Sequence, residues 1–259
     1  MHLTGEMKEQ FAKTGSCLVK NVLSQSRAAE LRSLVISLLE KEEAQGSSYL
    51  YAFDKSGKTK RVWNLTNKGQ VFRDLFEISL IDEFMNHIFD RETSHQKYFL
   101  SSFQATIVEP GSDRQRLHID TPFPEPLPPW PVKANTIWLL DDFTSENGAT
   151  EYVKGSHRLS LKPTSEDDQN IPVEKALGGA GSVLFTHGNL WHRAGANRSN
   201  KPRVALLCSF AASYAREISS EEDNLLVISD RVKAEASNHL KTILGVGHGI
   251  KEGALIEHE

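Results

Sequence analysis

The feature that most constrains the fold is a change of texture at Tyr98. Before this residue, apolar side chains recur at helical spacing over long stretches. After it, the chain breaks into short apolar runs separated by clusters of Gly, Pro, Asn and Ser. Short runs with this punctuation are typical of an antiparallel sandwich or a jelly roll. We therefore predict strands at residues 98–108, 134–140, 149–153, 182–186 and 203–210.

The N-terminal part predicts helices that flank this β core. Leu31, Leu34, Val35, Leu38 and Leu39 form an apolar stripe at helical spacing between residues 26 and 43. Further predicted elements are an early strand at 17–19, a helix at 80–89 and a last helix at 238–244. We expect a single domain over 1–259, with a helical part to about 95, a β core over about 96–215 and a C-terminal extension over 216–259.

Composition excludes several classes of partner. The 259 residues, 39% hydrophobic and 25% charged, can bury one sizeable core. A formal charge of −4 without a long basic run argues against nucleic acid. Two cysteines are too few for a disulfide framework, and the N-terminus lacks a long apolar stretch for secretion or membrane insertion. We therefore expect a cytoplasmic protein that acts on a small-molecule substrate, with no membrane partner.

His118-Ile119-Asp120 is the first half of a candidate metal site. Residues two apart in a strand point to the same face, so His118 and Asp120 can approach one ion while Ile119 points away. Imidazole and carboxylate ligands suit divalent iron, and three such ligands leave coordination positions open for a co-substrate and dioxygen. An isolated HxD is a weak signal, because ten histidines produce one by chance in many proteins.

A downstream segment supplies the second half. His187 and His192 follow an apolar run, and Arg203 opens the next one after a Gly- and Asn-rich connection. Five residues separate the two histidines, so in a regular strand only one of them faces the site, and spacing alone does not choose between them. A planar guanidinium matches a carboxylate in bidentate fashion, which makes Arg203 a candidate for holding a 2-oxo acid. The structural alternative is an arginine paired with a protein carboxylate.

Five short stretches together form a recognisable pattern: residues 117–120, 138–142, 147–149, 154–158 and 181–203. Through these stretches the segment from about 103 to 211 resembles the phytanoyl-CoA dioxygenase family of Fe(II)/2-oxoglutarate oxygenases. Lys154 departs from the family, which has proline at the first position of the Pro-Gly-Ser-His turn, and His157 in that turn is expected to fix backbone geometry. It implies a fold that is mainly β with flanking helices, around a double-stranded β-helix (jelly roll, cupin-like) core.

The resemblance also implies an assignment of the site. The family places its distal histidine eleven residues before the co-substrate arginine, which selects His192 with Arg203. Fe(II) would then be held by His118, Asp120 and His192, with 2-oxoglutarate and O2 as co-substrates. Related iron halogenases replace the carboxylate ligand with a small residue. Because Asp120 is retained, hydroxylation with release of succinate and CO2 is expected, although desaturation, cyclisation and endoperoxide formation use the same ligands.

Other side chains are candidates for the walls of the site. Gln104 and Thr106 share one strand face, and Gln104 is the preferred contact to the co-substrate. Trp138 is also assigned to the co-substrate site, although a large aromatic residue in an apolar strand more often fills the core. Candidates for completing the pocket from the N-terminal side are Arg61, Trp63 and Asn64.

A proline-rich segment follows the HxD motif. Residues 121–131 contain six of the ten prolines, which excludes a central strand and favours a stiff, extended loop. We interpret it as a substrate-facing wall, with Phe123 and Trp130 as apolar contacts. A plain connecting loop is the alternative.

Two rival functions remain open at this stage. One is a jelly-roll metal enzyme that uses no 2-oxo acid, for which Arg203 would have no purpose. The other is a non-catalytic barrel whose metal site has decayed, against which the intact His118, Asp120 and His192 argue.

Overall fold

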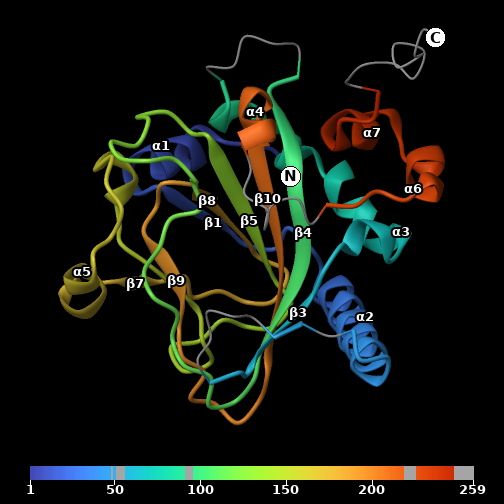
Figure 1. The fold of residues 1–259 in the computed structure, drawn as a ribbon, viewed down its shortest axis with the longest axis horizontal. Coiled ribbons are helices and arrows are strands. Elements are labelled where there is room, and N and C mark those ends of the chain that lie inside the picture. The colour runs from blue at the N-terminus through green and yellow to red at the C-terminus, as the bar shows by residue number, and fades with distance from the viewer. Residues whose placement is uncertain (48, 51–55, 91–95, 219–225, 248–259) are drawn as a thin grey trace, which may run out of the picture.

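Two antiparallel sheets form the centre of the molecule (Figure 1). The computed structural model describes residues 1–47, 49–50, 56–90, 96–218 and 226–247. Within these residues a seven-stranded sheet has the order β1-β8-β5-β10-β4-β3-β2, and a three-stranded sheet has the order β7-β6-β9. The strands are β1 (Ser16–Val19), β2 (Tyr49–Leu50), β3 (Thr59–Val62), β4 (Tyr98–Val108), β5 (Lys133–Leu139), β6 (Thr150–Tyr152), β7 (Glu174–Lys175), β8 (Val183–His187), β9 (His192–Ala194) and β10 (Arg203–Ala212).

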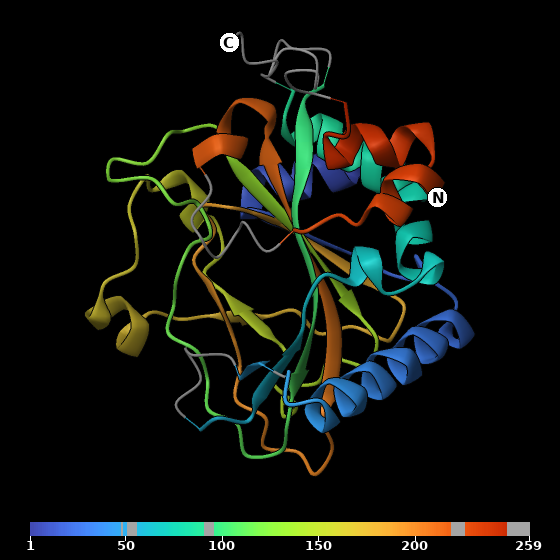
Figure 2. The ribbon, with the colours of Figure 1, turned by 45° about the vertical axis from the view of Figure 1, so that its right-hand side comes forward.

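Most helices gather on one side of the large sheet, and the small sheet lies on its other side (Figures 1 and 2). The helical layer buries a continuous apolar cluster against that side of the sheet. None of the described helices is long and apolar enough to span a membrane. The α-helices are α1 (Gly5–Thr14), α2 (Gln25–Ala44), α3 (Gln70–Arg73), α4 (Ser79–Ile88), α5 (Ser165–Asn170), α6 (Asp230–Glu235) and α7 (Asn238–Leu244), and the 3-10 turns are η1 (Leu65–Asn67), η2 (Asp74–Glu77), η3 (Ser156–Arg158) and η4 (Ser213–Ile218).

Helix α2 shows how the sequence pattern becomes packing. Ser24 caps its N-terminus by accepting a hydrogen bond from the Arg27 backbone N–H at 3.1 Å. Leu31, Val35 and Leu39 are buried, and burying each such side chain contributes about 1.5–3 kcal/mol. Leu34 was expected in the same stripe but is 38% exposed, because the buried face follows the i, i+4, i+8 row.

The strands divide the molecule into a core side and a cavity side. In β5, Thr136 and Trp138 face the helical layer, whereas Asn135 and Ile137 line a cavity between the two sheets. The central strand β10 pairs with both β4 and β5, which aligns Ser209 with Ser102 on one side and with Asn135 on the other. A polar row therefore crosses three strands on the cavity side.

Candidate metal centre and co-substrate cavity

A short antiparallel bridge brings the two predicted histidine ligands together. The His118 and His192 backbones exchange two hydrogen bonds of 3.0 Å, and their ring centroids are 4.5 Å apart. His118 forms only an isolated bridge and Asp120 lies outside any strand, so regular strand alternation is not what brings these two side chains together. Pro122 has no N–H for a sheet ladder, and the proline-rich loop begins at this point.

Asp120 is held close to both histidines by hydrogen bonds outside the His118–His192 bridge. Its backbone N–H donates to the Gly188 carbonyl at 2.9 Å, which fixes the segment next to the end of β8. Asn135 Nδ2 donates to Asp120 Oδ2 at 2.6 Å and orients the carboxylate. His192 Nε2 lies 3.3 Å from Asp120 Oδ2, and His118 Nε2 lies 3.8 Å from Asp120 Oδ1. One ligand atom from each of the three side chains lies within 4.8 Å of the others.

Both imidazoles are held in a tautomer that suits a metal. His118 Nδ1 lies 2.9 Å from the Arg116 carbonyl, and His192 Nδ1 lies 2.9 Å from the Leu190 carbonyl. A carbonyl only accepts, so each Nδ1 carries the proton and each Nε2 offers its lone pair to the shared point.

The charges around this point also fit a divalent cation. Burial, followed by the neighbouring His192, lowers the pKa of His118 and keeps this imidazole neutral. Burial alone would raise the pKa of Asp120, but His192, His118 and Lys133 together lower it, so the carboxyl is ionised. Two imidazoles and one carboxylate on one face are the donor set of non-haem iron oxygenases. The residues present therefore fit Fe(II).

Arg203 lies at the far end of the same space. It is 2% exposed, and its Nη2 donates to the Gly148 carbonyl at 2.6 Å while its guanidinium carbon lies 4.5 Å from the centre of the Phe143 ring. No carboxylate among the described residues forms an ion pair with it, and its Nε has no hydrogen-bond partner there. Burial, with the neighbouring Arg61 cation, lowers its pKa. A buried cation of this kind calls for an anionic ligand.

A cavity of about 170 Å³ joins Arg203 to the metal ligands. Both sheets contribute to its wall, and much of the lining is polar. The lining residues are Thr59, Arg61, Trp63, Ser102, Gln104, Thr106, Gln115, His118, Asp120, Asn135, Ile137, Thr150, His192, Arg193, Ala194, Arg203, Leu207 and Ser209.

Several predicted wall residues lie in this cavity. Gln104 and Thr106 both line it, and Gln104 Oε1 is buried without a hydrogen-bond partner among the described residues. Arg61 lines it from β3 and Trp63 from just beyond the end of that strand, as expected from the N-terminal side. Asn64 does not line it, and its side-chain oxygen instead accepts from the Val227 N–H at 3.0 Å.

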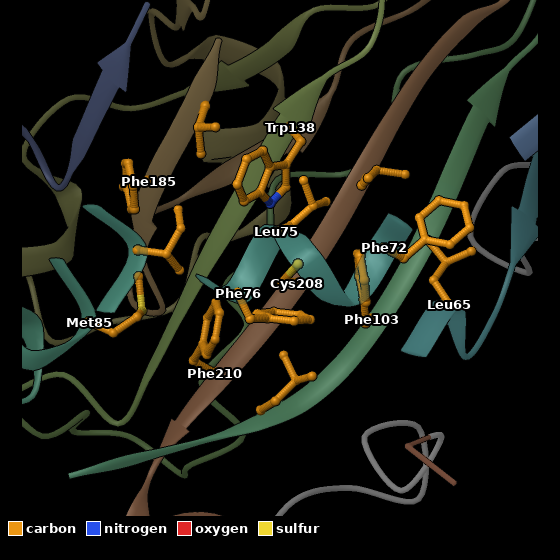
Figure 3. Packing of buried hydrophobic residues seen from close by; sticks show 14 of the residues in the cluster. Leu65, Phe72, Leu75, Phe76, Met85, Phe103, Trp138, Phe185, Cys208 and Phe210 are labelled. Carbon is orange, nitrogen blue, oxygen red and sulfur yellow. The ribbon is translucent and has the colours of Figure 1, made fainter. Parts of the chain in front are cut away.

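Trp138 lies on the wrong side of the sheet to contact a co-substrate. It is fully buried among Leu75, Phe76 and Cys208 (Figure 3), and its Nε1 donates to Thr136 Oγ1 at 3.1 Å. Strand alternation explains the error, because its neighbour Ile137 faces the cavity. We therefore correct the assignment and leave Trp138 out of the co-substrate site.

The proline-rich loop is anchored beside the site rather than within the cavity. Leu127 donates its backbone N–H to the Ser160 carbonyl at 2.8 Å, and Asn189 Nδ2 donates to the Pro128 carbonyl at 3.0 Å. Phe123 packs against the main apolar cluster, Trp130 is 41% exposed, and neither lines the cavity. Their role as substrate contacts stays a prediction.

The structure distinguishes the two histidines that spacing left open. His187 ends β8 on the core side, where its Nδ1 accepts the Asn189 N–H at 3.0 Å and its ring lies 5.2 Å from that of His157. Neither His187 nor His157 belongs to the metal cluster. His157 lies against the end of α1, with its Nε2 3.2 Å from the Ala12 carbonyl.

Sequence reasoning missed several residues around the metal ligands. Gln115 lines the cavity, its Oε1 accepts the Ala194 N–H at 2.8 Å, and its amide nitrogen, with no hydrogen-bond partner among the described residues, can donate to a ligand. Asn135 orients Asp120, as described above. No periodicity marks Gln115, because its segment is not a regular strand. Asn135 carried a usable signal, since a polar residue within an apolar strand needs a partner.

Comparison with known proteins decides the family. The sequence model described as phytanoyl-CoA dioxygenase (PhyH) matches residues 11–205, which is 195 of 259 residues. The chain belongs to the phytanoyl-CoA dioxygenase family. The family predicted from the motifs is therefore confirmed. So is the enzyme class, an Fe(II)- and 2-oxoglutarate-dependent dioxygenase.

Relatives and solved structures extend the similarity over most of the chain. Dioxygenase ALT11 of Alternaria alternata is 26% identical, covering 96% of this chain and 84% of its own. Dioxygenase FUM3 of Gibberella moniliformis is 27% identical, covering 86% and 76%. The structure of SnoK, a non-haem α-ketoglutarate-dependent carbocyclase from nogalamycin biosynthesis, aligns with a TM-score of 0.63 at 22% identity, covering 81% of this chain and 84% of SnoK. HygX from Streptomyces hygroscopicus, solved with nickel, 2-oxoglutarate and hygromycin B, aligns with a TM-score of 0.64 at 18% identity, covering 82% and 88%. These likenesses confirm the predicted jelly-roll fold.

Proposed function

We propose that this dioxygenase binds Fe(II) through His118, Asp120 and His192 and hydroxylates a carbon of a small natural-product intermediate. The observation that carries the proposal is the convergence of three correctly oriented ligand atoms at one end of a cavity whose other end holds a buried arginine that forms no ion pair among the described residues. A metal enzyme without a 2-oxo acid has no need of that arginine. In a non-catalytic barrel that has lost its metal site, the fixed tautomers of His118 and His192 would serve no purpose.

Three residues of the cavity have a definite task in this proposal. Arg203 binds the distal carboxylate of 2-oxoglutarate, and the free nitrogen of Gln115 is a further donor to the co-substrate. Asn135 holds the Asp120 carboxylate in place. When bound, Fe(II) and 2-oxoglutarate supply the activation of dioxygen, with succinate and carbon dioxide as products. The cavity walls limit the access of water to the reacting atoms.

The ligand set and the polar lining of the cavity support a reaction outcome and a substrate class. Asp120 occupies the ligand position that a halide would need, so we propose oxygen transfer to carbon instead of halogenation. The polar row of Ser102, Ser209 and Asn135 places hydrogen-bonding groups beside the metal ligands. This lining suits a functionalised intermediate better than a bare acyl chain. Among the solved neighbours, SnoK comes from nogalamycin biosynthesis and HygX was solved with hygromycin B bound, which supports the same class.

The test is substrate-dependent succinate formation across a panel of oxygen- and nitrogen-bearing natural-product intermediates, with fatty acyl-CoA esters as the contrasting set. The proposal expects coupled succinate formation with members of the first set, and products that have gained one oxygen atom from labelled dioxygen. Turnover with acyl-CoA esters alone would overturn the substrate class. Coupled turnover without oxygen gain would assign cyclisation, desaturation or epimerisation instead.

A further inference from the structure

Helix α5 is an accessory to the two sheets. Its six residues, Ser165–Asn170, lie at the outer edge of the molecule, in the connection between η3 and β7 (Figure 1). Thr164 and Asp167 form a capping box, in which the Thr164 side chain accepts the Asp167 N–H and the Asp167 carboxylate accepts the Thr164 N–H. This cap accounts for Asp167 but leaves Asp168 free for another task.

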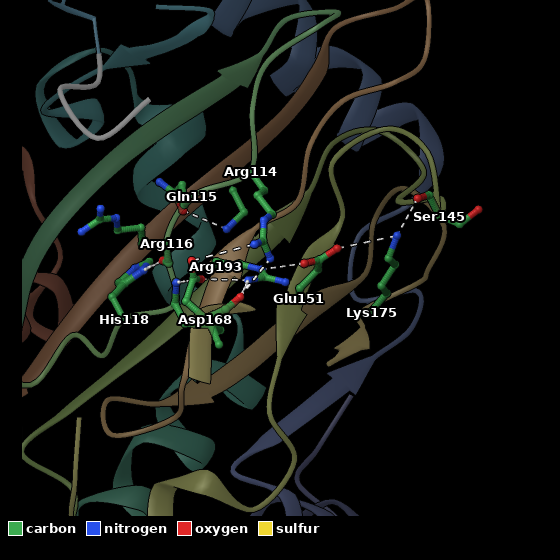
Figure 4. A network of polar contacts seen from close by, with 11 residues as sticks. Arg114, Gln115, Arg116, His118, Ser145, Glu151, Asp168, Lys175 and Arg193 are labelled. Atoms are coloured by element: carbon green, nitrogen blue, oxygen red, sulfur yellow. Dashed lines mark hydrogen bonds and ion pairs between the residues drawn. The ribbon is translucent and has the colours of Figure 1, made fainter. Parts of the chain in front are cut away.

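The Asp168 carboxylate turns inward and joins the two segments that carry the histidine ligands (Figure 4). Its Oδ1 accepts the Leu117 N–H at 2.7 Å, one residue before His118. The same oxygen accepts a hydrogen bond from Arg193 Nη1 at 2.9 Å, one residue after His192. A single oxygen atom of an accessory helix therefore touches the immediate neighbours of both imidazole ligands.

Arg193 connects this oxygen to the small sheet. Its side chain is 6% exposed, and its Nε donates to Glu151 Oε2 at 2.7 Å. Its Nη1 also donates to the Asp168 carbonyl at 3.1 Å. Since Glu151 lies opposite Arg193 in the pairing of β6 with β9, the guanidinium is fixed from two directions. Charge-assisted bonds of this kind, away from water, are strong and specific in geometry.

The charge state of Asp168 agrees with a fixed anion. Burial alone would raise the pKa of its carboxyl, but the Leu117 N–H and the Arg193 guanidinium lower it overall. The exposed Arg114 also contacts Asp168, with its Nη1 donating to the Asp168 carbonyl at 3.2 Å and its Nη2 3.9 Å from Asp168 Oδ2.

We propose that Asp168 is a positioning residue of the metal centre, which sets the separation of His118 and His192 by fixing Leu117 and Arg193 to one oxygen. The inference rests on the proposed metal site. The two segments are also joined by the two hydrogen bonds of the His118–His192 bridge and by those between Gln115 and Ala194, and the Asp168 oxygen adds a further connection directly beside each imidazole ligand. Outer residues that orient ligands typically change metal affinity by about 10- to 100-fold when they are mutated.

The experiment measures Co(II) binding, followed by visible absorption, in the full chain and in two charge-matched variants. Asp168→Asn keeps an oxygen acceptor for Leu117 but removes the anion that fixes Arg193. Glu166→Gln removes the same charge from the same turn of α5, where Glu166 is exposed. We expect the Co(II) dissociation constant to rise by about tenfold or more in Asp168→Asn, with altered absorption bands at saturation, and to stay at the wild-type value in Glu166→Gln.

A dissociation constant in Asp168→Asn equal to that of the wild type would overturn the inference. A merely structural role predicts a lower melting temperature of the metal-free protein with unchanged affinity and bands. If Asp168→Asn does not fold, Arg193→Lys serves in its place, because a lysine cannot bridge Glu151 and Asp168 as a guanidinium does. Weakened Co(II) binding in that variant supports the inference, and wild-type binding contradicts it. Failure of the wild type itself to bind Co(II) would instead overturn the proposed metal site.

Discussion

Replacing Arg203 with methionine tests the co-substrate end of the cavity. Methionine keeps an unbranched stem that can pack over Phe143 but removes the guanidinium, which is the only part of Arg203 suited to a carboxylate. Arg203 is 2% exposed and forms no ion pair among the described residues. Removing one partner from a buried charge pair costs about 2–5 kcal/mol. The dissociation constant of 2-oxoglutarate should therefore rise by roughly 30-fold to several thousand-fold.

The same change should leave the ligand-free protein stable. In the folded state Arg203 is disfavoured by burial and by the nearby Arg61 cation, both of which lower its pKa. An apolar side chain of similar length removes this cost, which offsets the lost hydrogen bond to the Gly148 carbonyl. We expect a melting temperature near the wild-type value without ligand, and a lost stabilisation by 2-oxoglutarate.

The assay is calorimetric titration of the metal-loaded protein without oxygen, using 2-oxoglutarate and 2-oxopentanoate. The second compound has the same chain length but lacks the distal carboxylate. The wild type should strongly prefer 2-oxoglutarate, and Arg203→Met should lose the preference. The control is Arg198→Met, whose side chain is 66% exposed. Unchanged 2-oxoglutarate affinity in Arg203→Met would refute the assigned contact.

Three further changes test separate parts of the account. Burial, with a contribution from His157, lowers the pKa of His187 from 6.5 to about 3 in the folded protein. Between pH 3 and pH 6.5 the unfolded chain therefore binds one more proton at this residue than the folded protein does. The free energy of unfolding should therefore be highest above pH 6.5 and fall as the pH decreases towards 3, by up to about 1.4 kcal/mol per pH unit. Denaturant titrations at several pH values should show a weaker dependence of this free energy on pH in His187→Gln, but an unchanged dependence in the control His239→Gln. Trp138→Phe should lower the melting temperature by removing core volume and the bond to Thr136, while an altered 2-oxoglutarate affinity would restore Trp138 to the site. In Gly188→Ala the new Cβ would lie 2.6 Å from the Lys133 carbonyl oxygen, so the backbone at residue 188, whose carbonyl accepts the Asp120 N–H, must shift. We expect weaker Co(II) binding in this variant, and wild-type affinity would show that this backbone does not position Asp120.

Elements with a strong local pattern could be predicted from the sequence alone. The strand Tyr98–Val108 and the helix Asn238–Leu244 have the expected bounds, because length, periodicity and turn residues define them locally. The short strands β3, β7 and β9 were not predicted. Each has two to four residues and exists through pairing with a distant partner, as β9 does with β6. Local sequence contains no record of such pairing.

The same distinction between local patterns and contacts of distant segments applies to the residues of the site. His118 and Asp120 could be nominated from their chemistry and spacing, whereas His192 was preferred to His187 through the family resemblance. The face assigned to Trp138 was wrong because alternation defines two faces without saying which one meets the cavity. Asp168 could not be found, since its two partners come together only in the folded chain.

The most direct measurement is the visible charge-transfer band of the Fe(II) chelate with 2-oxoglutarate, recorded without oxygen. Iron bound by His118, Asp120 and His192, with open positions for the co-substrate, should give a weak band when both components are added to the wild type. The band should be lost in His118→Ala and require much more 2-oxoglutarate in Arg203→Met. Absence of the band in the folded wild type, or an unchanged band in His118→Ala, would contradict the assigned iron site.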